Sequence, residues 1–184
     1  MQARAMKALV PLAEGFEELE AVTIIDVLRR AGVEVTTAAL AATPVTGSHA
    51  ISVAADTLLD SVDPRSFDAV VLPGGPAAKR LRDDARIRSL VQTAARDGKL
   101  VAALCAAPIA LEAAGVLAGK RATVYPGNEL PSAAAVVTER VVVDGTIVTS
   151  RGPGTALEFA LTLVEKLVSV EKANELRRAM LVAD

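Results

Sequence analysis

The chain has one cysteine, Cys105, which ends the apolar run KLVAALC and precedes AAPIALEAAG. A short apolar run followed by helical periodicity predicts a strand-to-helix turn, and in an open α/β sheet such turns border the ligand crevice. Amide N–H groups at a helix start would lower the pKa of the thiol and favour the nucleophilic thiolate. A small buried core residue would fit the same position, because most free cysteines are buried.

Three carboxylates lie in the segment GFEELEA, at the first predicted strand-to-helix turn: Glu17, Glu18 and Glu20. Acidic side chains are favourable at a helix N-terminus, and at 3.6 residues per turn they fan out around the axis, so at most two can face the crevice. A carboxyl in a partly apolar pocket would have a raised pKa and could hold or move a proton. The spacing does not choose among the three.

Two glycine motifs could bring backbone amides to a ligand. In LPGGPAA, the N–H groups of Gly75 and, after the cysteine, of Ala106 could form an oxyanion hole, although most Gly-Gly pairs only make a turn. The segment SRGPGT (150–155) lacks the Lys-Ser/Thr ending of a phosphate-binding loop, so we favour a structural role as a helix entry.

His49 is the only histidine and lies in a polar turn, where histidines are more often surface residues than catalytic bases. A Cys–His pair would have to use it, within one chain or across a subunit boundary. The lone cysteine has no Cys/His neighbours at metal-ligand spacing, so we expect no metal site and no intrachain disulfide. A reducing compartment, most simply the cytoplasm, is therefore the expected location.

Composition excludes several classes of protein. Of 184 residues, 52% are hydrophobic but only 2% are aromatic, so the expected single domain (1–184) has an aliphatic core. The 20 basic and 22 acidic residues are interleaved, which argues against a nucleic-acid surface. The apolar run 100–119 is long enough to span a membrane, but Pro108 and Glu112 favour a buried strand and helix, so no membrane partner is expected.

Alternation of β-branched runs with helical periodicity predicts βα units around a largely parallel sheet. Two short strands are expected within 43–60, and Asp144-Gly145 is expected as the two-residue turn of a hairpin over 140–150. The predicted strands are 7–12, 33–40, 68–75, 99–105 and 121–126, and the predicted helices are 17–32, 83–99, 106–115, 155–168 and 171–180.

Four motifs together resemble the ThiJ/PfpI superfamily and, within it, the DJ-one (Parkinson disease protein seven) branch. They are GFEELEAV, LPGG, AALCAAP and TSRGPGTALEFAL, and the likeness runs from about Lys7 to Leu167. The resemblance implies an α/β, flavodoxin-like sandwich with a mostly parallel central sheet flanked by helices on both faces, assembled as a homodimer. It also implies that Cys105 is the nucleophile and that Glu20 lies against its sulfur, with the backbone of Gly74, Gly75 and Ala106 around the adduct oxygen.

Members of this family are described as glyoxalases that convert methylglyoxal to lactate without glutathione, as protein deglycases and as oxidation-sensing chaperones. The resemblance therefore implies small reactive aldehydes or glycated molecules as substrates, and no cofactor. A redox sensor acting through Cys105, a small-molecule amidase or isonitrile hydratase, a protease and a flavodoxin-like binding module are the alternatives. The missing phosphate loop disfavours the last.

The chain departs from the family pattern near the cysteine. Protease-like members have a histidine directly after the cysteine, whereas this chain has Ala106, so a peptidase dyad is not supported. Many animal members carry a histidine where this chain has Tyr125, which is a candidate weak acid in its place. Tyr125 and His49 are thus the auxiliary candidates, and redox chemistry would rest on Cys105 alone.

Overall fold

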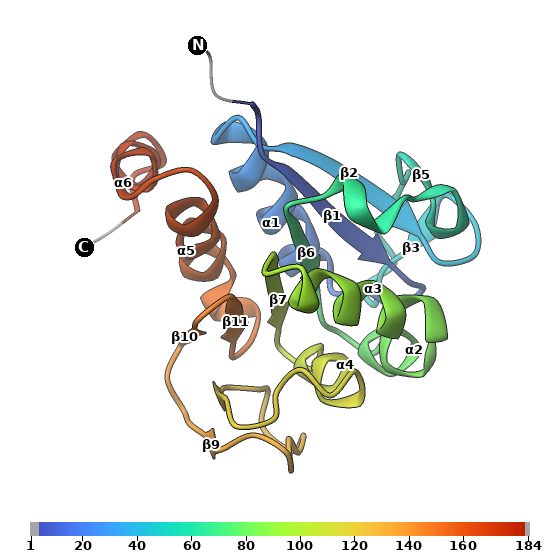
Figure 1. Ribbon diagram of the computed structural model, residues 1–184. Helices are drawn as coiled ribbons and strands as arrows, with labels where there is room; N and C mark the ends of the chain where they lie inside the picture. The colour runs from blue at the N-terminus through green and yellow to red at the C-terminus, as the bar shows by residue number, and fades with distance from the viewer. Residues whose placement is uncertain (1–3, 183–184) are drawn as a thin grey trace.

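A seven-stranded sheet forms the centre of the computed structural model, which describes residues 4–182 (Figure 1). Its strands are β1 (Lys7–Leu12), β2 (Glu34–Ala39), β5 (Thr57–Leu58), β6 (Ala69–Leu72), β7 (Leu100–Leu104), β10 (Val141–Asp144) and β11 (Ile147–Ser150). They run in the order β10-β11-β7-β6-β1-β2-β5, and every neighbouring pair is parallel except β10–β11. The five central strands follow the flavodoxin order, which confirms the predicted fold class.

Helices cover both faces of the sheet. They are α1 (Glu18–Arg30), α2 (Ala78–Asp83), α3 (Ala85–Arg96), α4 (Pro108–Ala113), α5 (Ala156–Leu167) and α6 (Val170–Ala179). On one face α1 packs against α5, which also contacts α6, whereas α2, α3 and α4 pack together on the other (Figure 1). Because both faces are covered, every residue of β6 and β7 is buried, as continuous apolar strands of parallel sheets require.

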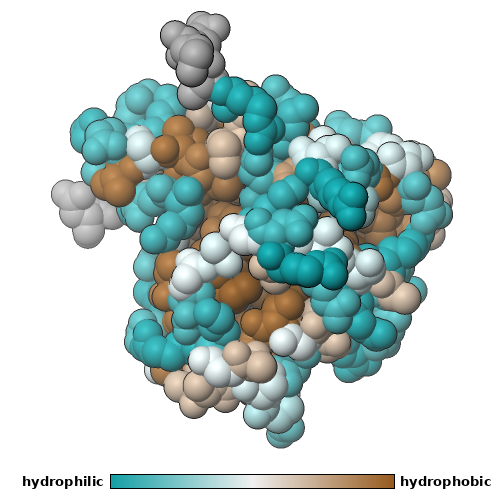
Figure 2. Space-filling model, in the orientation of Figure 1, coloured by the Kyte–Doolittle hydropathy of each residue, from teal (hydrophilic) through white to brown (hydrophobic). Residues whose placement is uncertain are grey.

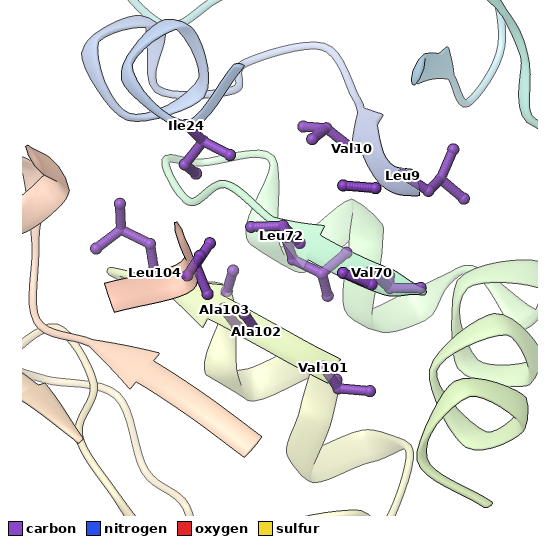
Figure 3. Packing of buried hydrophobic residues seen from close by; sticks show 14 of the residues in the cluster. Leu9, Val10, Ile24, Val70, Leu72, Val101, Ala102, Ala103 and Leu104 are labelled. Atoms are coloured by element: carbon purple, nitrogen blue, oxygen red, sulfur yellow. The ribbon is translucent and has the colours of Figure 1, made fainter. Parts of the chain in front are cut away.

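The core is aliphatic, as the composition predicted. Ile24 of α1 points toward the central strands, which carry Leu72 on β6 and Leu104 on β7 (Figure 3). Small residues such as Ala102 and Ala103, which point to opposite faces of β7, let helices approach the sheet closely. On the face drawn in Figure 2, hydrophilic residues are interspersed with small apolar patches.

The segment 121–126 does not return to the central sheet, so that prediction was wrong. Only β8 (Arg121–Ala122) is extended, and it pairs with β9 (Ala135–Val136) in a separate two-stranded sheet. The edge of β7 is already occupied by β11, and β10 covers the far side of β11. The chain after β8 instead lies against the end of β7, where the Tyr125 N–H donates to the Cys105 carbonyl over 2.8 Å.

Two short-strand predictions need correction in detail. Within 43–60, β3 (Val45–Thr46) and β4 (Ser52–Val53) form the expected pair, but β5 in the same segment joins the central sheet and was not predicted. In the 140–150 hairpin, Asp144 pairs with Ile147, so the loop residues are Gly145 and Thr146 rather than Asp144 and Gly145. Gly145 alone has positive φ, +63°, as a turn with glycine at its first central position requires.

The remaining differences concern short helices. The apolar run 100–119 forms β7 followed by α4, as expected, whereas α2 was not predicted. No helix within residues 4–182 combines the length and the apolar character needed to cross a membrane. Three short 3-10 helices complete the elements: η1 (Leu59–Ser61), η2 (Pro64–Ser66) and η3 (Pro153–Thr155).

Candidate active site

Cys105 follows directly after β7 in a strained backbone conformation, with φ +64°. This left-handed region is uncommon for residues with a side chain and must be held by the surroundings. Here the Cys105 N–H donates to the Ser150 carbonyl over 2.9 Å, while its own carbonyl accepts from Tyr125. Because α4 begins only at Pro108, the cysteine lies in a sharp turn rather than in the first turn of a helix.

Glu20 lies next to the sulfur because three neighbouring strands end at the same edge of the sheet. The segment after β1 carries Glu20 on α1, the segment after β6 carries Gly74, and β7 leads to Cys105. Glu20 is fully buried, and its Oε2 accepts from the Gly74 N–H over 2.8 Å. Its Oε1 is buried and has no hydrogen-bond partner among the described residues. The carboxyl and the Cys105 thiol are nevertheless close enough to shift each other's pKa.

Gly74 and Gly75 are required by close contacts. A Cβ on Gly74 would lie 2.7 Å from the Cys105 Cβ and 2.8 Å from Glu20 Oε2. Gly75 has φ +85°, and a Cβ there would lie 2.6 Å from the backbone nitrogen of Glu17. Any side chain at either position would therefore push the carboxyl, the cysteine or the start of α1 out of place.

The predicted backbone donors divide into two roles. The N–H groups of Gly75 and Ala106 lie beside the Cys105 sulfur and lower the pKa of the thiol. The N–H of Gly74 is already used by Glu20, so it does not face an adduct at the sulfur. Two of the three predicted positions thus lie beside the sulfur, and the third holds the carboxyl.

The pKa of Cys105 is raised, whereas the sequence predicted that it would be lowered. Burial raises the pKa of Glu20 to about 7. Burial, with the charge of Glu20 added, raises the pKa of Cys105 to about 12, and this outweighs the two N–H donors. The pair therefore gains its first negative charge near neutral pH, and these two pKa values put that charge on the carboxyl, so a thiolate exists here only when Glu20 keeps its proton.

Cys105, only 6% exposed, lies at the wall of a cavity of about 540 Å³ that opens to solvent. Glu20 lies behind the cysteine and does not line this space. A buried acid, a thiol and an open cavity together form a site where a small molecule can meet the sulfur. The cavity is lined by Glu17, Ser48, His49, Gly75, Pro76, Ala78, Lys79, Cys105, Ala106, Ile109, Tyr125, Asn128 and Pro153.

The hairpin of β3 and β4 brings His49 to this cavity within one chain, which the sequence left open. The ring Nδ1 of His49 lies 2.9 Å from Glu18 Oε2, and the backbone N–H of His49 donates to Glu18 Oε1. Burial would raise the pKa of Glu18, but hydrogen bonds from His49 and from the Ile51 N–H hold it at about 2. The hydrogen bond and the charge of Glu18 in turn raise the pKa of His49.

Glu17, Glu18 and His49 offer ligand atoms within 4.8 Å of one another, among the residues that the structure describes. The carboxylates are already used, Glu18 by the hairpin and Glu17 by the Glu20 N–H, which donates to Glu17 Oε2 over 2.8 Å. We assign no metal to this cluster.

Sequence reasoning placed Cys105, Gly75, Ala106, Tyr125 and His49 among the candidates, and all five line the cavity. It missed Lys79 because α2 was not predicted, and it missed Ile109 and Asn128 because neither belongs to a glycine or acidic motif. Pro153 lies in the SRGPGT segment, for which only a structural role was expected.

Residues 6–166 match the model of the DJ-1/PfpI family. Protein DJ-1 homolog B of Arabidopsis thaliana is 45% identical over 95% of this chain and 41% of its own length, so the chain spans less than half of that relative. Protein dj-1beta of Drosophila melanogaster is 42% identical over 96% of this chain and 97% of its own. The Caenorhabditis elegans protein named glutathione-independent glyoxalase DJR-1.2 is 34% identical over 92% of both chains.

Solved structures agree with these relatives. The crystal structure of Drosophila melanogaster DJ-1beta superposes with a TM-score of 0.94 at 41% identity, over 98% of this chain and 100% of the other. Oxidized Toxoplasma gondii DJ-1 superposes with a TM-score of 0.91, also at 41% identity and with the same coverage. Sequence and structure thus agree that the chain belongs to the DJ-1/PfpI family and, within it, to the DJ-1 branch.

Proposed function

We propose that this protein is a glutathione-independent glyoxalase that acts on 2-oxoaldehydes such as methylglyoxal. The observation that carries the proposal is the fully buried Glu20, with one unpartnered oxygen, beside a cysteine at the wall of an open cavity. The name of the 34% identical Caenorhabditis elegans relative supports the same activity.

The reaction needs a nucleophile and one group that moves a proton. The Cys105 thiolate adds to the aldehyde carbon, forming a C–S bond, and the new alkoxide takes a proton to give a hemithioacetal. Glu20 then removes the proton from that carbon and returns it to the neighbouring carbonyl carbon, while the hydroxyl proton moves to the oxygen of that neighbouring carbon, which gives a 2-hydroxyacyl thioester. Water cleaves the thioester, releasing the hydroxy acid and the thiol.

The atoms and electrons balance, since a 2-oxoaldehyde and one water become one 2-hydroxy acid. One carbon is oxidised and its neighbour reduced, so the reaction needs no external electron acceptor or cofactor. We assign the N–H groups of Gly75 and Ala106 to the adduct oxygen, because they already face the sulfur. Tyr125 and His49 are proposed as auxiliary groups because they line the same cavity.

A lactate assay with methylglyoxal and without glutathione tests the proposal. We expect turnover by the wild type, none by Cys105→Ser, and a loss of at least about 100-fold in Glu20→Gln, the usual scale for removing a general acid–base group. Glu112→Gln is the matched control, because Glu112 bonds Ser132 away from the cavity and should keep full activity. Lactate formation no faster with wild type than with Cys105→Ser would reject the proposal.

We propose deglycase activity as a variant of the same reaction. The open cavity could admit the carbonyl-derived adducts of glycated proteins, to which the same addition step would apply. Both substrates are small carbonyl groups that reach the sulfur from solvent. We propose the cytoplasm as the location, because an unpaired nucleophilic thiol persists in a reducing compartment.

Oxidation sensing is the second candidate, favoured by the 41% identical Toxoplasma gondii relative whose structure is described as oxidized. In this chain, the N–H groups beside the sulfur and a protonated Glu20 could donate to the oxygens of a sulfinate. Peroxide should then add two oxygen atoms per chain, detected by intact mass, and Cys105→Ser should gain none. Negligible glyoxalase turnover together with this modification would favour the sensor.

We also propose a homodimer. Leu19, Val22 and Ile51 are large apolar residues that are 55%, 49% and 57% exposed. Leu19 and Val22 lie three residues apart on α1, and Ile51 lies beside them because its N–H approaches Glu18 Oε1 at 3.4 Å. Such a patch on one face is typical of a protein interface.

A further inference from the structure

Three charged side chains line the cavity of Cys105, and two of them, Glu17 and His49, belong to one group of charges with the buried Glu18. Glu17 caps α1 through its Oε2, and its Oε1 lies 3.9 Å from the His49 Nδ1. His49 is paired with the buried Glu18 carboxylate. This side of the cavity therefore presents no uncompensated cation.

Lys79 is the third charged residue and has no such partner. It lies in the first turn of α2, is exposed and lines the cavity. Within residues 4–182 its ammonium group forms no ion pair or hydrogen bond. A second cavity of about 500 Å³ lies on the other side of Lys79, and Arg80 lines only that one.

Resting on the proposed function, we propose that Lys79 binds a carboxylate of the substrate, so that the preferred substrates are 2-oxoaldehydes that end in a carboxylate. A lone ammonium group offers one positive charge, which matches a carboxylate, whereas a phosphate is usually held by several donors. The aldehyde end would meet Cys105 while the carboxylate end reaches the rim, since both residues line one cavity. An exposed charge of this kind changes rates by about 3- to 10-fold.

Alkylation of Cys105 tests the charge of the cavity without reference to turnover. Iodoacetate and iodoacetamide both alkylate a thiolate, whose sulfur displaces iodide, and they differ by one negative charge. The chain has no other cysteine that could react. We expect the ratio of the iodoacetate rate to the iodoacetamide rate to fall about 3- to 10-fold in Lys79→Gln and further in Lys79→Glu. At about 1 M salt the wild-type ratio should approach that of Lys79→Gln, because the Debye length shrinks to about 3 Å.

Arg80→Gln is the matched control, since it removes the same charge one residue away but outside the cavity of the cysteine. It should leave the ratio unchanged. An equal fall in Arg80→Gln would show a general field rather than a site, and an unchanged ratio in Lys79→Gln would overturn the proposal directly.

Turnover separates this inference from the glyoxalase proposal. We expect Lys79→Gln to lower kcat/KM for 4,5-dioxopentanoate about 3- to 10-fold and to leave kcat/KM for the uncharged 2-oxopentanal unchanged. If wild type converts neither compound, the glyoxalase proposal fails while the alkylation ratio still decides the role of Lys79. If both are converted and Lys79→Gln changes no ratio, the glyoxalase stands and the carboxylate preference is wrong.

Discussion

Glu20 and Cys105 form a pair in which each group limits the ionisation of the other. Burial gives the carboxyl a pKa of about 7 instead of 4.5, so it is poised to hold or release a proton near neutral pH. The same burial disfavours the charged carboxylate in the folded protein. The residue that we assign to proton transfer is therefore one that weakens the fold whenever it ionises.

Glu20→Gln should for this reason stabilise the protein at alkaline pH. A folded-state pKa raised from 4.5 to about 7 means that the native state holds a proton that the unfolded state has lost, so wild-type stability falls with rising pH across this window. The full difference is about 3 kcal/mol above pH 7 and vanishes below about pH 4.5. Urea unfolding of both proteins between these limits measures it.

A stability difference between wild type and Glu20→Gln that does not change with pH would contradict a raised carboxyl pKa. Activity gives an independent check, because the variant that is more stable at alkaline pH should be the one that loses lactate formation.

The hairpin of β3 and β4 is the element that connects α1 to the cavity. Its turn closes over the buried Glu18, whose carboxylate accepts from the backbone of His49 and Ile51. Gly47 makes this closure possible, since a Cβ there would lie 2.3 Å from Glu18 Cδ. The position of His49 at the cavity thus depends on one glycine and one buried acid.

Titration of the only histidine by NMR tests this arrangement. In the wild type, the hydrogen bond to Glu18 should hold the pKa of His49 above 6.5. Gly47→Ala displaces the carboxylate and Glu18→Gln removes its charge, so the pKa of His49 should return toward 6.5 in both variants. Gly154→Ala is the control, because a Cβ there meets no atom within 4 Å. A His49 pKa that stays at the wild-type value in both Gly47→Ala and Glu18→Gln would refute the proposed dependence of His49 on Glu18.

At the scale of the whole molecule, Leu19, Val22 and Ile51 form a group of large apolar side chains that the fold leaves exposed. The patch joins the first turns of α1 to the hairpin that carries His49. Burying it against a second copy would remove apolar area from water and would hold the hairpin against α1.

Leu19→Glu should therefore dissociate the proposed dimer, since it would place a charge in an apolar interface. Sedimentation over a range of protein concentrations should show a dimer for wild type and a monomer for the variant. Val136→Glu is the control, because Val136 is similarly exposed, at 51%, but lies on β9 in the separate two-stranded sheet. A wild type that sediments as a monomer, or a variant that remains a dimer, would reject this interface.

The sequence by itself determined the βα order of the central elements and the position of Cys105 at the end of β7. Apolar runs such as 69–72 and 100–104 are continuous because both faces of the sheet are covered, and α1 shows clear helical periodicity. These are local patterns, so they can be read without the fold. The strand predicted over 121–126 was wrong, because β11 and β10 already occupy the positions beyond β7.

The spacing of the three acids near the first turn left their roles open, and the family resemblance implied only that of Glu20. The tertiary structure decided how all three divide their roles. Glu20 faces the sulfur, Glu18 holds the hairpin, and Glu17 caps α1, although all three lie in one short segment. The structure also reversed the expected direction of the Cys105 pKa. Both results follow from desolvation and from partners on distant strands and loops, and neither effect is encoded in the local spacing of residues.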